Sequence, residues 1–277
     1  MAEQIIIMDS AGDLQELPGA SFASVPLTIQ AENHEFVDNE STNVEQMVNF
    51  LQSYKGKAST ACPSVGDFLE KFGDAKEVFC ITITSGLSGS YNAAKIAAKT
   101  YIESHPDRKV HIFDSLSAGP EMALLAEKVR DLIHKKLPFD TIVQQVEAYR
   151  KNTRLMFSLE SLHNLANNGR VPAAVAKIAG MLGIRLLGKA SEEGTLEPTG
   201  KVRGEAKLVG ELMQHLSKMG YSGGKIRITH CFNEEAAIKL RETIRSKFAN
   251  ADVTISAARA LCSFYAERGG LLIGFEV

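Results

Sequence analysis

The chain has 277 residues, 44% of them hydrophobic and 23% charged, with a formal net charge of −2. These values are typical of a globular protein of one large domain or two ordinary ones, and they argue against nucleic-acid binding through bulk positive charge. The N-terminus, MAEQIIIMDS, lacks the basic segment and long apolar stretch of a signal peptide, and no window resembles an integral membrane segment. Scattered cysteines without a CxxC pair predict neither a metal site nor a disulfide framework, and they favour a cytoplasmic location.

The first half of the sequence predicts alternating strands and helices. Residues 5–8 and 25–29 are short apolar runs that predict strands, and the apolar spacing over residues 44–54 predicts a helix. Thr42 and Glu45 have the spacing of a capping box at the start of that helix.

The same alternation continues toward the middle of the chain. Residues 78–84 predict a strand buried on at least one face, followed by a serine- and glycine-rich turn and an alanine-rich helix over residues 91–101. Residues 110–113 predict the next strand, and a helix is expected to begin near Pro120, since proline is tolerated in a first turn. This pattern predicts an open parallel α/β sheet, whose ligands bind at the carboxyl ends of the strands.

The second half predicts a mixed sheet. Strands are expected over residues 155–158, 184–190, 196–202, 226–231, 253–256 and 271–277. Helices are expected over residues 159–166, 173–181, 205–219 and 233–248. The second and third strands flank Glu193-Gly194, which predicts a hairpin. The fold class is therefore α/β with two α/β domains, residues 1–152 with a mainly parallel sheet and residues 153–277 with a mixed sheet.

Two turns rich in small and hydroxyl-bearing residues lead into helices. Ser85 and Ser88 belong to the SGLSGS turn, and Thr60 and Ser64 belong to the TACPS turn. Exposed backbone N–H groups and hydroxyls at a helix start favour an anion. Each turn alone is better explained by helix capping, and neither matches GxGxxG or a phosphate-binding P-loop.

Several charged residues have more than one interpretation. Asp9 and Asp114 each follow a strand and could hold Mg²⁺ in a small-molecule phosphotransferase, but hydrogen bonding to loop backbone is the favoured role because no third carboxylate motif accompanies them. Arg170, Arg185 and Arg203 could contact an anion or an acidic partner, although a single arginine is more often a solvated surface residue.

Seven segments, in this order along essentially the whole chain, resemble the DegV family of fatty-acid-binding proteins. They are IIIMDSAGDL, VPLTI, TACPS, ITITSGLSGSYNAA, IFDSLSAGPEMALL, LESLHNLANNGRV and AGMLGIRLL. The resemblance implies two α/β domains with a long-chain fatty acid between them. It also implies that hydroxyls at Thr60 and Ser85, near Ser88, hold the carboxylate.

The resemblance implies further roles on the head-group or partner side of the site. Arg170 matches the arginine of the family's GGR turn, Arg203 matches a later basic residue, and Asp38 matches an acidic loop residue. Bacterial relatives of this kind present the fatty acid to a separate kinase, which transfers phosphate from ATP to the carboxylate. A carrier of this kind implies no catalytic residues of its own and no cofactor besides the bound fatty acid.

The sequence departs from the family pattern at two places that bear on function. Ala61 stands where the TSxPS turn has its second hydroxyl, and the family's C-terminal HTGPG is absent. Tyr265 falls near the position of that histidine and can donate one hydrogen bond to the carboxylate. Ligand binding is therefore better supported than coupling to a kinase. The alternatives are a regulatory binding protein for another acidic amphiphile and the phosphotransferase described above.

Overall fold

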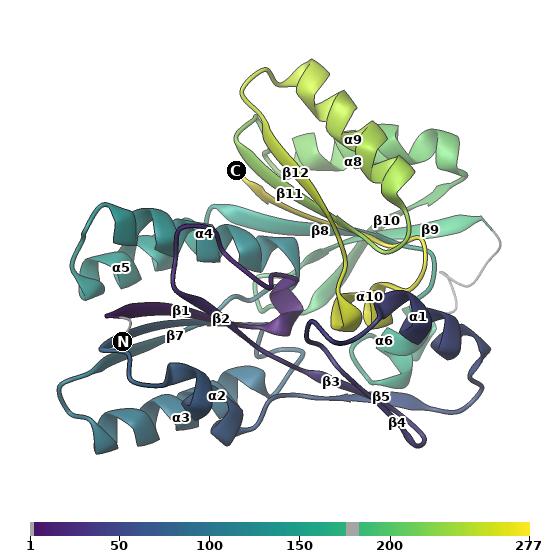
Figure 1. Ribbon diagram of the computed structural model, residues 1–277. Helices are drawn as coiled ribbons and strands as arrows, with labels where there is room; N and C mark the ends of the chain where they lie inside the picture. The colour runs from purple at the N-terminus through teal and green to yellow at the C-terminus, as the bar shows by residue number, and fades with distance from the viewer. Residues whose placement is uncertain (1–2, 176–182) are drawn as a thin grey trace.

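The computed structural model describes residues 3–175 and 183–277, which form three β-sheets flanked by helices (Figure 1). The first sheet is fully parallel, with the strand order β2-β1-β6-β7. Its strands are β1 (Gln4–Asp9), β2 (Phe22–Val25), β6 (Glu77–Thr82) and β7 (Lys109–Asp114). The predicted parallel sheet is confirmed.

Side chains alternate between the two faces of this sheet, as the period of a strand requires. Ile7 and Cys80 pack with the helices α2 (Val65–Phe72) and α3 (Ser90–Ser104) on one face. Met8 and Ile81 pack on the other face with α4 (Pro120–His134) and α5 (Phe139–Arg150). The apolar residues of the buried strands therefore support two separate hydrophobic clusters.

A small antiparallel sheet, which the sequence did not predict, has the order β4-β3-β5 beside α1 (Val44–Ser53). Its strands are β3 (Thr28–Ala31), β4 (His34–Val37) and β5 (Ala58–Ala61). The single strand predicted over residues 25–29 is wrong: β2 ends before Pro26, which has no N–H to donate, and β3 belongs to a different sheet. The predicted capping box is also wrong, because Asn43 caps α1 and Thr42 donates to the Val37 carbonyl.

The second half forms a six-stranded mixed sheet with the order β10-β9-β8-β13-β11-β12. Its strands are β8 (Thr153–Leu159), β9 (Ile184–Ala190), β10 (Leu196–Arg203), β11 (Lys225–His230), β12 (Asp252–Ala257) and β13 (Leu271–Glu276). The predicted hairpin is confirmed by the antiparallel pairing of β9 and β10. Helices α8 (Glu205–Lys218) and α9 (Glu234–Lys247) pack on one face of this sheet.

The helices predicted between β8 and β9 are shorter than expected or lie outside the described residues. The structure has α6 (His163–Asn167) in place of the helix predicted over residues 159–166, because β8 continues to Leu159. Most of the helix predicted over residues 173–181 lies outside the described residues. Within the described part of the chain, no helix has the length and apolar character needed to cross a bilayer.

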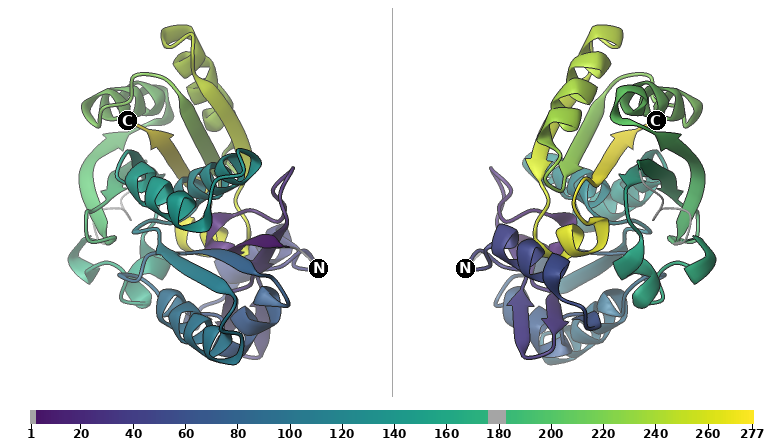
Figure 2. Two further views of the ribbon diagram at one scale, coloured as in Figure 1. Left: turned by 90° about the vertical axis from the view of Figure 1, so that its left-hand side faces the viewer. Right: turned by 90° about the vertical axis from the view of Figure 1, so that its right-hand side faces the viewer.

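Two helices lie between the parallel and mixed sheets, where both views of Figure 2 place them. Helix α4 packs so closely on β13 that a Cβ at Gly274 would overlap backbone of Pro120 and Glu121. In helix α10 (Ala260–Ala266), Phe264 packs beside Ile29 of the small antiparallel sheet. The boundary predicted at residue 152 falls between α5 and β8 and stays a prediction, since α10 packs against the half that precedes it.

Candidate functional site

An apolar cavity of about 80 Å³ lies at the carboxyl ends of the parallel strands. Each of the four strands contributes one lining residue just beyond its end. These residues are Ala11, Leu27, Ile83 and Ala118. This is the edge at which open α/β sheets bind ligands, because the loops there converge.

The opposite wall of the cavity comes from the mixed sheet and α10. On β8, Leu155, Phe157 and Leu159 face the cavity, while Met156 between them faces the core under α8 and α9. The remaining apolar lining residues are Leu87, Leu165, Leu196, Leu261, Cys262, Ala266 and Leu272. The cavity is therefore lined mainly by apolar side chains from both halves of the chain.

Four polar residues complete the lining: Thr60, Ser88, Arg170 and Tyr265. The hydroxyl oxygens of Thr60 and Tyr265 lie 2.7 Å apart, although the two residues are 205 positions apart in the sequence. Burial raises the pKa of the Tyr265 hydroxyl above its ordinary value, against the opposing effects of Thr60 and Arg170. Tyr265 is therefore protonated at neutral pH and keeps a proton to donate.

Arg170 brings a guanidinium to the same lining. Its Nε donates to the Leu87 carbonyl at 3.2 Å, its Nη1 donates to the Asn168 carbonyl, and its guanidinium carbon lies 6.0 Å from the centre of the Tyr265 ring. Gly169, with φ of 72°, provides the left-handed residue that ends α6 and turns the chain toward Arg170. The Nη2 donors make no hydrogen bond to any described residue, so they can bind an anion.

The turn after β6 is held in place by two aspartates. Asp9 accepts hydrogen bonds from the Ile83 N–H at 2.9 Å and the Ser90 hydroxyl at 2.5 Å. Asp114 accepts from the N–H groups of Ser85 and Leu116, each at 3.1 Å. The favoured prediction for both aspartates, hydrogen bonding to loop backbone, is confirmed. Within residues 3–175 and 183–277, no cluster of three or more histidines, cysteines or carboxylates is arranged to hold a metal ion.

Two carboxylates from the first half position α10, which carries Tyr265. Asp38 accepts from the N–H groups of Ala260 and Leu261 at 3.0 and 3.1 Å, and Asp13 accepts from the Arg259 N–H at 2.9 Å. Both carboxylates therefore satisfy donors at the start of α10. Burial raises the pKa of Asp13 to about 7 and also raises the pKa of Asp38.

The structure separates the other predicted site residues from the cavity. Ser85 is exposed and lies outside the cavity lining, and Ser64 is an exposed N-cap that forms a capping box with Asp67 on α2. Arg203 is exposed on β10. Asp38 is only 1% exposed and contacts α10 rather than the cavity. Thr60, Ser88, Arg170 and Tyr265 are thus the predicted residues that the structure brings together.

Neither the apolar lining nor the role of Asp13 could be predicted from local sequence patterns. The alternation of Leu155, Phe157 and Leu159 identifies one buried face of a strand, but cavity and core residues share that pattern. Asp13 stands in a loop and accepts from the N–H of Arg259, which directly precedes α10 and lies 246 positions later in the sequence. No local signal predicts such a pair.

The fold and the cavity define a class of α/β proteins in which a parallel and a mixed sheet enclose an apolar cavity with one polar end. The model of a family described as "Uncharacterised protein, DegV family" matches residues 4–276. A DegV domain-containing protein of Streptococcus pneumoniae is 45% identical over 276 residues, which cover 98% of each chain. This chain therefore belongs to the DegV family, as the sequence segments predicted.

Two solved structures match the fold over nearly the whole chain, each with a TM-score of 0.97 and 44% sequence identity. One is a DegV family protein from Eubacterium eligens loaded with heptadecanoic acid, and the match covers 99% of both chains. The other is the B3 protein of the Streptococcus pneumoniae fatty acid kinase loaded with linoleic acid, and the match covers 100% of both chains. The predicted fold class, with an N-terminal parallel sheet and a C-terminal mixed sheet, is confirmed.

Proposed function

We propose that this chain binds a long-chain fatty acid, with the acyl tail in the apolar cavity and the carboxylate at its polar end. The observation that carries the proposal is the cavity lining itself, which is apolar except for Thr60, Ser88, Arg170 and Tyr265. The similar proteins loaded with heptadecanoic and linoleic acid support the same ligand class. No catalytic residue is part of the proposal, and the chain acts as a carrier.

The energetics of this lining suit a lipid. Burying each methylene contributes about 0.8 kcal/mol, so a tail of about fourteen methylenes contributes roughly 11 kcal/mol before ordering costs. Each hydrogen bond to the carboxylate adds about 1.5–3 kcal/mol. The tail therefore supplies most of the affinity, and the polar end fixes the orientation of the ligand.

The cavity must widen to admit such a tail. Its volume of about 80 Å³ is smaller than the roughly 300–1,000 Å³ of typical ligand cavities. The lining consists largely of leucines on separate elements, including Leu87 after β6, Leu196 on β10 and Leu272 on β13. Separation of these walls by the entering tail is part of the proposed binding step.

We infer a second step, in which the bound acid is presented to a separate kinase. The kinase would transfer a phosphoryl group from ATP to the carboxylate, and the products would be an acyl phosphate and ADP. Similarity to the B3 protein of a fatty acid kinase supports this role. A phosphotransferase reaction in this chain alone is not favoured, because Asp9 and Asp114 are engaged with loop backbone.

The binding step can be tested directly. Mass spectrometry of the denatured, purified protein should release a fatty acid in about equimolar amount, and the delipidated protein should take up added oleate or palmitate. Thr60→Val keeps the size of the side chain and removes its hydroxyl, so this variant should retain less ligand than Ser64→Ala, which alters only a helix cap. Absence of any acyl species together with no uptake would overturn the proposal.

The kinase step needs a separate assay. Loaded carrier, mixed with a fatty acid kinase and ATP, should yield acyl phosphate, which hydroxylamine traps as a hydroxamate. ATP turnover without hydroxamate formation, measured with carrier shown to be loaded, would reject presentation while leaving fatty-acid binding in place.

A further inference from the structure

A second groove, of about 530 Å³, lies where α5 ends, β8 begins and β9 ends. Five cationic side chains from α5, β8, β9 and α8 line this groove. They are Arg150, Lys151, Arg154, Lys189 and Lys218. The chain as a whole has a net charge of −2, so this concentration of positive charge is local.

Only two carboxylates line the same groove, and one of them is shielded. Glu121 is buried and accepts hydrogen bonds from the hydroxyls of Ser117 at 2.5 Å and Thr153 at 2.7 Å. Burial raises the pKa of Glu121 above its ordinary value. Glu192 is exposed on the loop between β9 and β10, so it is the one lining carboxylate open to solvent.

Neighbouring carboxylates neutralise only part of the positive charge. Arg150 pairs with Glu147 at 2.9 Å, and Lys189 pairs with Glu197 at 3.4 Å. Among the described residues, no carboxylate lies within ion-pair distance of the other three cations. These are Lys151, Arg154 and Lys218. The groove therefore holds like charges close together without enough counter-charge.

Helix stabilisation explains some of these cations but not all. Arg150, Lys151 and Lys218 stand at the ends of α5 and α8, where the helix dipole favours positive charge. Arg154 and Lys189 lie on strands, and the helix dipole does not account for them. Cations from four different elements thus line one groove whose volume is in the range of small-molecule sites.

We propose that this groove binds a small anion that carries two or more phosphate groups. Phosphate oxygens accept hydrogen bonds from lysine and arginine, and a polyphosphate carries enough charge to neutralise several cations at once. Ser191 lies on the β9 side of the groove, and its hydroxyl can donate either to Thr195 Oγ1 at 2.9 Å or to a bound anion. A ligand that spans the groove would contact Lys151 after α5 and Lys189 on β9 at the same time.

Such a ligand would also restrict the motion of the loop between β9 and β10. The loop meets the turn after β6 closely, because a Cβ at Gly194 would overlap the Thr84 hydroxyl. Anion binding across the groove adds a contact at the base of this loop, through Lys189 and Ser191. Backbone amides of residues 191–195 should then exchange hydrogen more slowly when the anion is present.

The test is calorimetric titration of the full chain with inorganic tripolyphosphate at low salt, with parallel titrations of ATP and adenosine. We expect saturable binding of one tripolyphosphate per chain that weakens as salt rises, and no binding of adenosine. Tighter binding of ATP would identify a nucleotide as the ligand, and tighter binding of tripolyphosphate would identify an inorganic polyphosphate. Either order supports a phosphate site.

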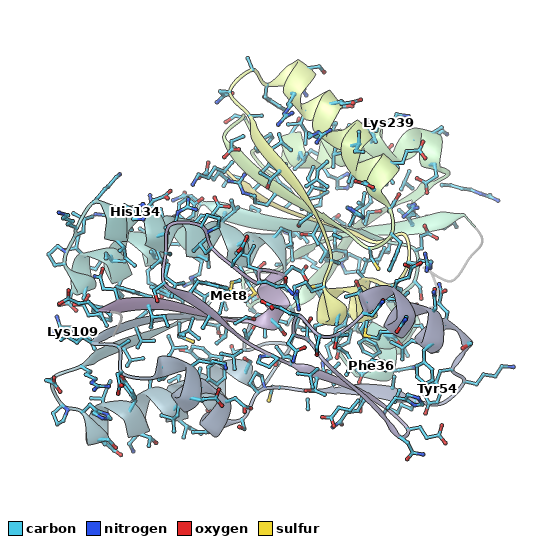
Figure 3. All side chains as sticks on the ribbon, viewed as in Figure 1. Met8, Phe36, Tyr54, Lys109, His134 and Lys239 are labelled. Carbon is cyan, nitrogen blue, oxygen red and sulfur yellow. The ribbon has the colours of Figure 1, made fainter. Side chains whose placement is uncertain are left out.

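The double variant Lys151→Gln/Lys218→Gln should weaken tripolyphosphate binding at least about tenfold, since it removes two exposed, unpaired cations. The matched control is Lys239→Gln, at an exposed lysine of α9 far from the groove (Figure 3). None of the three substituted lysines lines the apolar cavity, so the fatty-acid content of both variants should stay unchanged. A failure of the phosphate proposal can therefore be distinguished from a failure of the fatty-acid proposal. The proposal would be overturned if tripolyphosphate showed no saturable binding, or if both variants lost tripolyphosphate affinity equally. It would also be overturned if a hexaglutamate peptide bound more tightly than tripolyphosphate.

Discussion

Replacing Tyr265 with phenylalanine removes one hydroxyl from the polar end of the cavity and leaves the ring in place. The ring packs against Phe264 with centroids 4.8 Å apart, and the hydroxyl lies 2.7 Å from Thr60 Oγ1. The variant Tyr265→Phe should therefore keep the packing of α10 while losing one hydrogen-bond donor.

Two free-energy changes should follow from this substitution. Loss of the hydrogen bond to Thr60 should lower the free energy of unfolding by about 0.5–1.5 kcal/mol. Loss of a donor to the carboxylate should weaken fatty-acid binding by about 1.5–3 kcal/mol, which is roughly a 10- to 150-fold increase in Kd. The second change is larger because an ion accepts a stronger hydrogen bond than a hydroxyl does.

Calorimetric titration of delipidated protein with oleate below its micelle concentration measures the Kd, and urea unfolding measures the stability. Tyr54→Phe is a matched control, since Tyr54 lines a different groove and its hydroxyl makes no hydrogen bond to a described residue. If Tyr265→Phe loses the expected stability but binds oleate within about twofold of the unmodified chain, the hydroxyl does not contact the carboxylate. The assignment of the polar end would then be wrong.

Three further predictions test the site, its electrostatics and its closure. Ser88→Ala should weaken oleate binding about tenfold or more and Ser85→Ala about twofold or less in the same titration, because Ser88 lines the cavity and Ser85 does not. Burial raises the pKa of Asp13 from 3.8 to about 7, so the folded chain holds a proton that the unfolded chain releases, and stability should fall as pH rises between these values. Asp13→Asn, which suits the local φ of 57°, should flatten that fall by at most about 3 kcal/mol between pH 5 and pH 8, and urea unfolding at these two pH values measures it. Gly204→Ala should lower the free energy of unfolding by about 1 kcal/mol, because residue 204 has a φ of 83° and no close neighbour. Gly194→Ala should lower it by about 1–3 kcal/mol more, because the added Cβ would overlap the turn after β6. Equal losses for the two variants on urea unfolding would contradict the close contact between Gly194 and that turn.

The central strands of the parallel sheet, β1 and β6, could be predicted because they are largely buried apolar runs that end in turn residues. The strand at residues 78–84 and the helix near Pro120 illustrate this, since the spacing of apolar residues and the turn residues or proline at their ends are enough to locate them. The small antiparallel sheet could not be predicted in the same way. Its strands have four residues each, and β3 follows β2 after only two residues, so an apolar run that continues across Pro26 hides the change of sheet.

The candidate site was predicted only in part, because its residues meet through tertiary packing. Thr60 and Ser88 belong to segments of small and hydroxyl-bearing residues that lead into helices, and this pattern predicts an anion site. The same pattern includes Ser64 and Ser85, which the structure places on the surface. Hydroxyl residues at helix starts serve equally well as caps and as ligand donors. Only the position of each turn relative to β8 and α10 separates the two roles.

The geometry of the polar end depends on contacts that lie away from the cavity. Helix α10 has seven residues and too little hydrogen bonding of its own to be stable alone. Its first N–H groups bind Asp38, and the preceding Arg259 N–H binds Asp13, so two segments from the opposite half of the chain determine where the helix begins. Because Tyr265 lies one turn and a half further along, the 2.7 Å contact with Thr60 follows from that starting point. The two carboxylates therefore act as positioning residues for a site that neither of them lines.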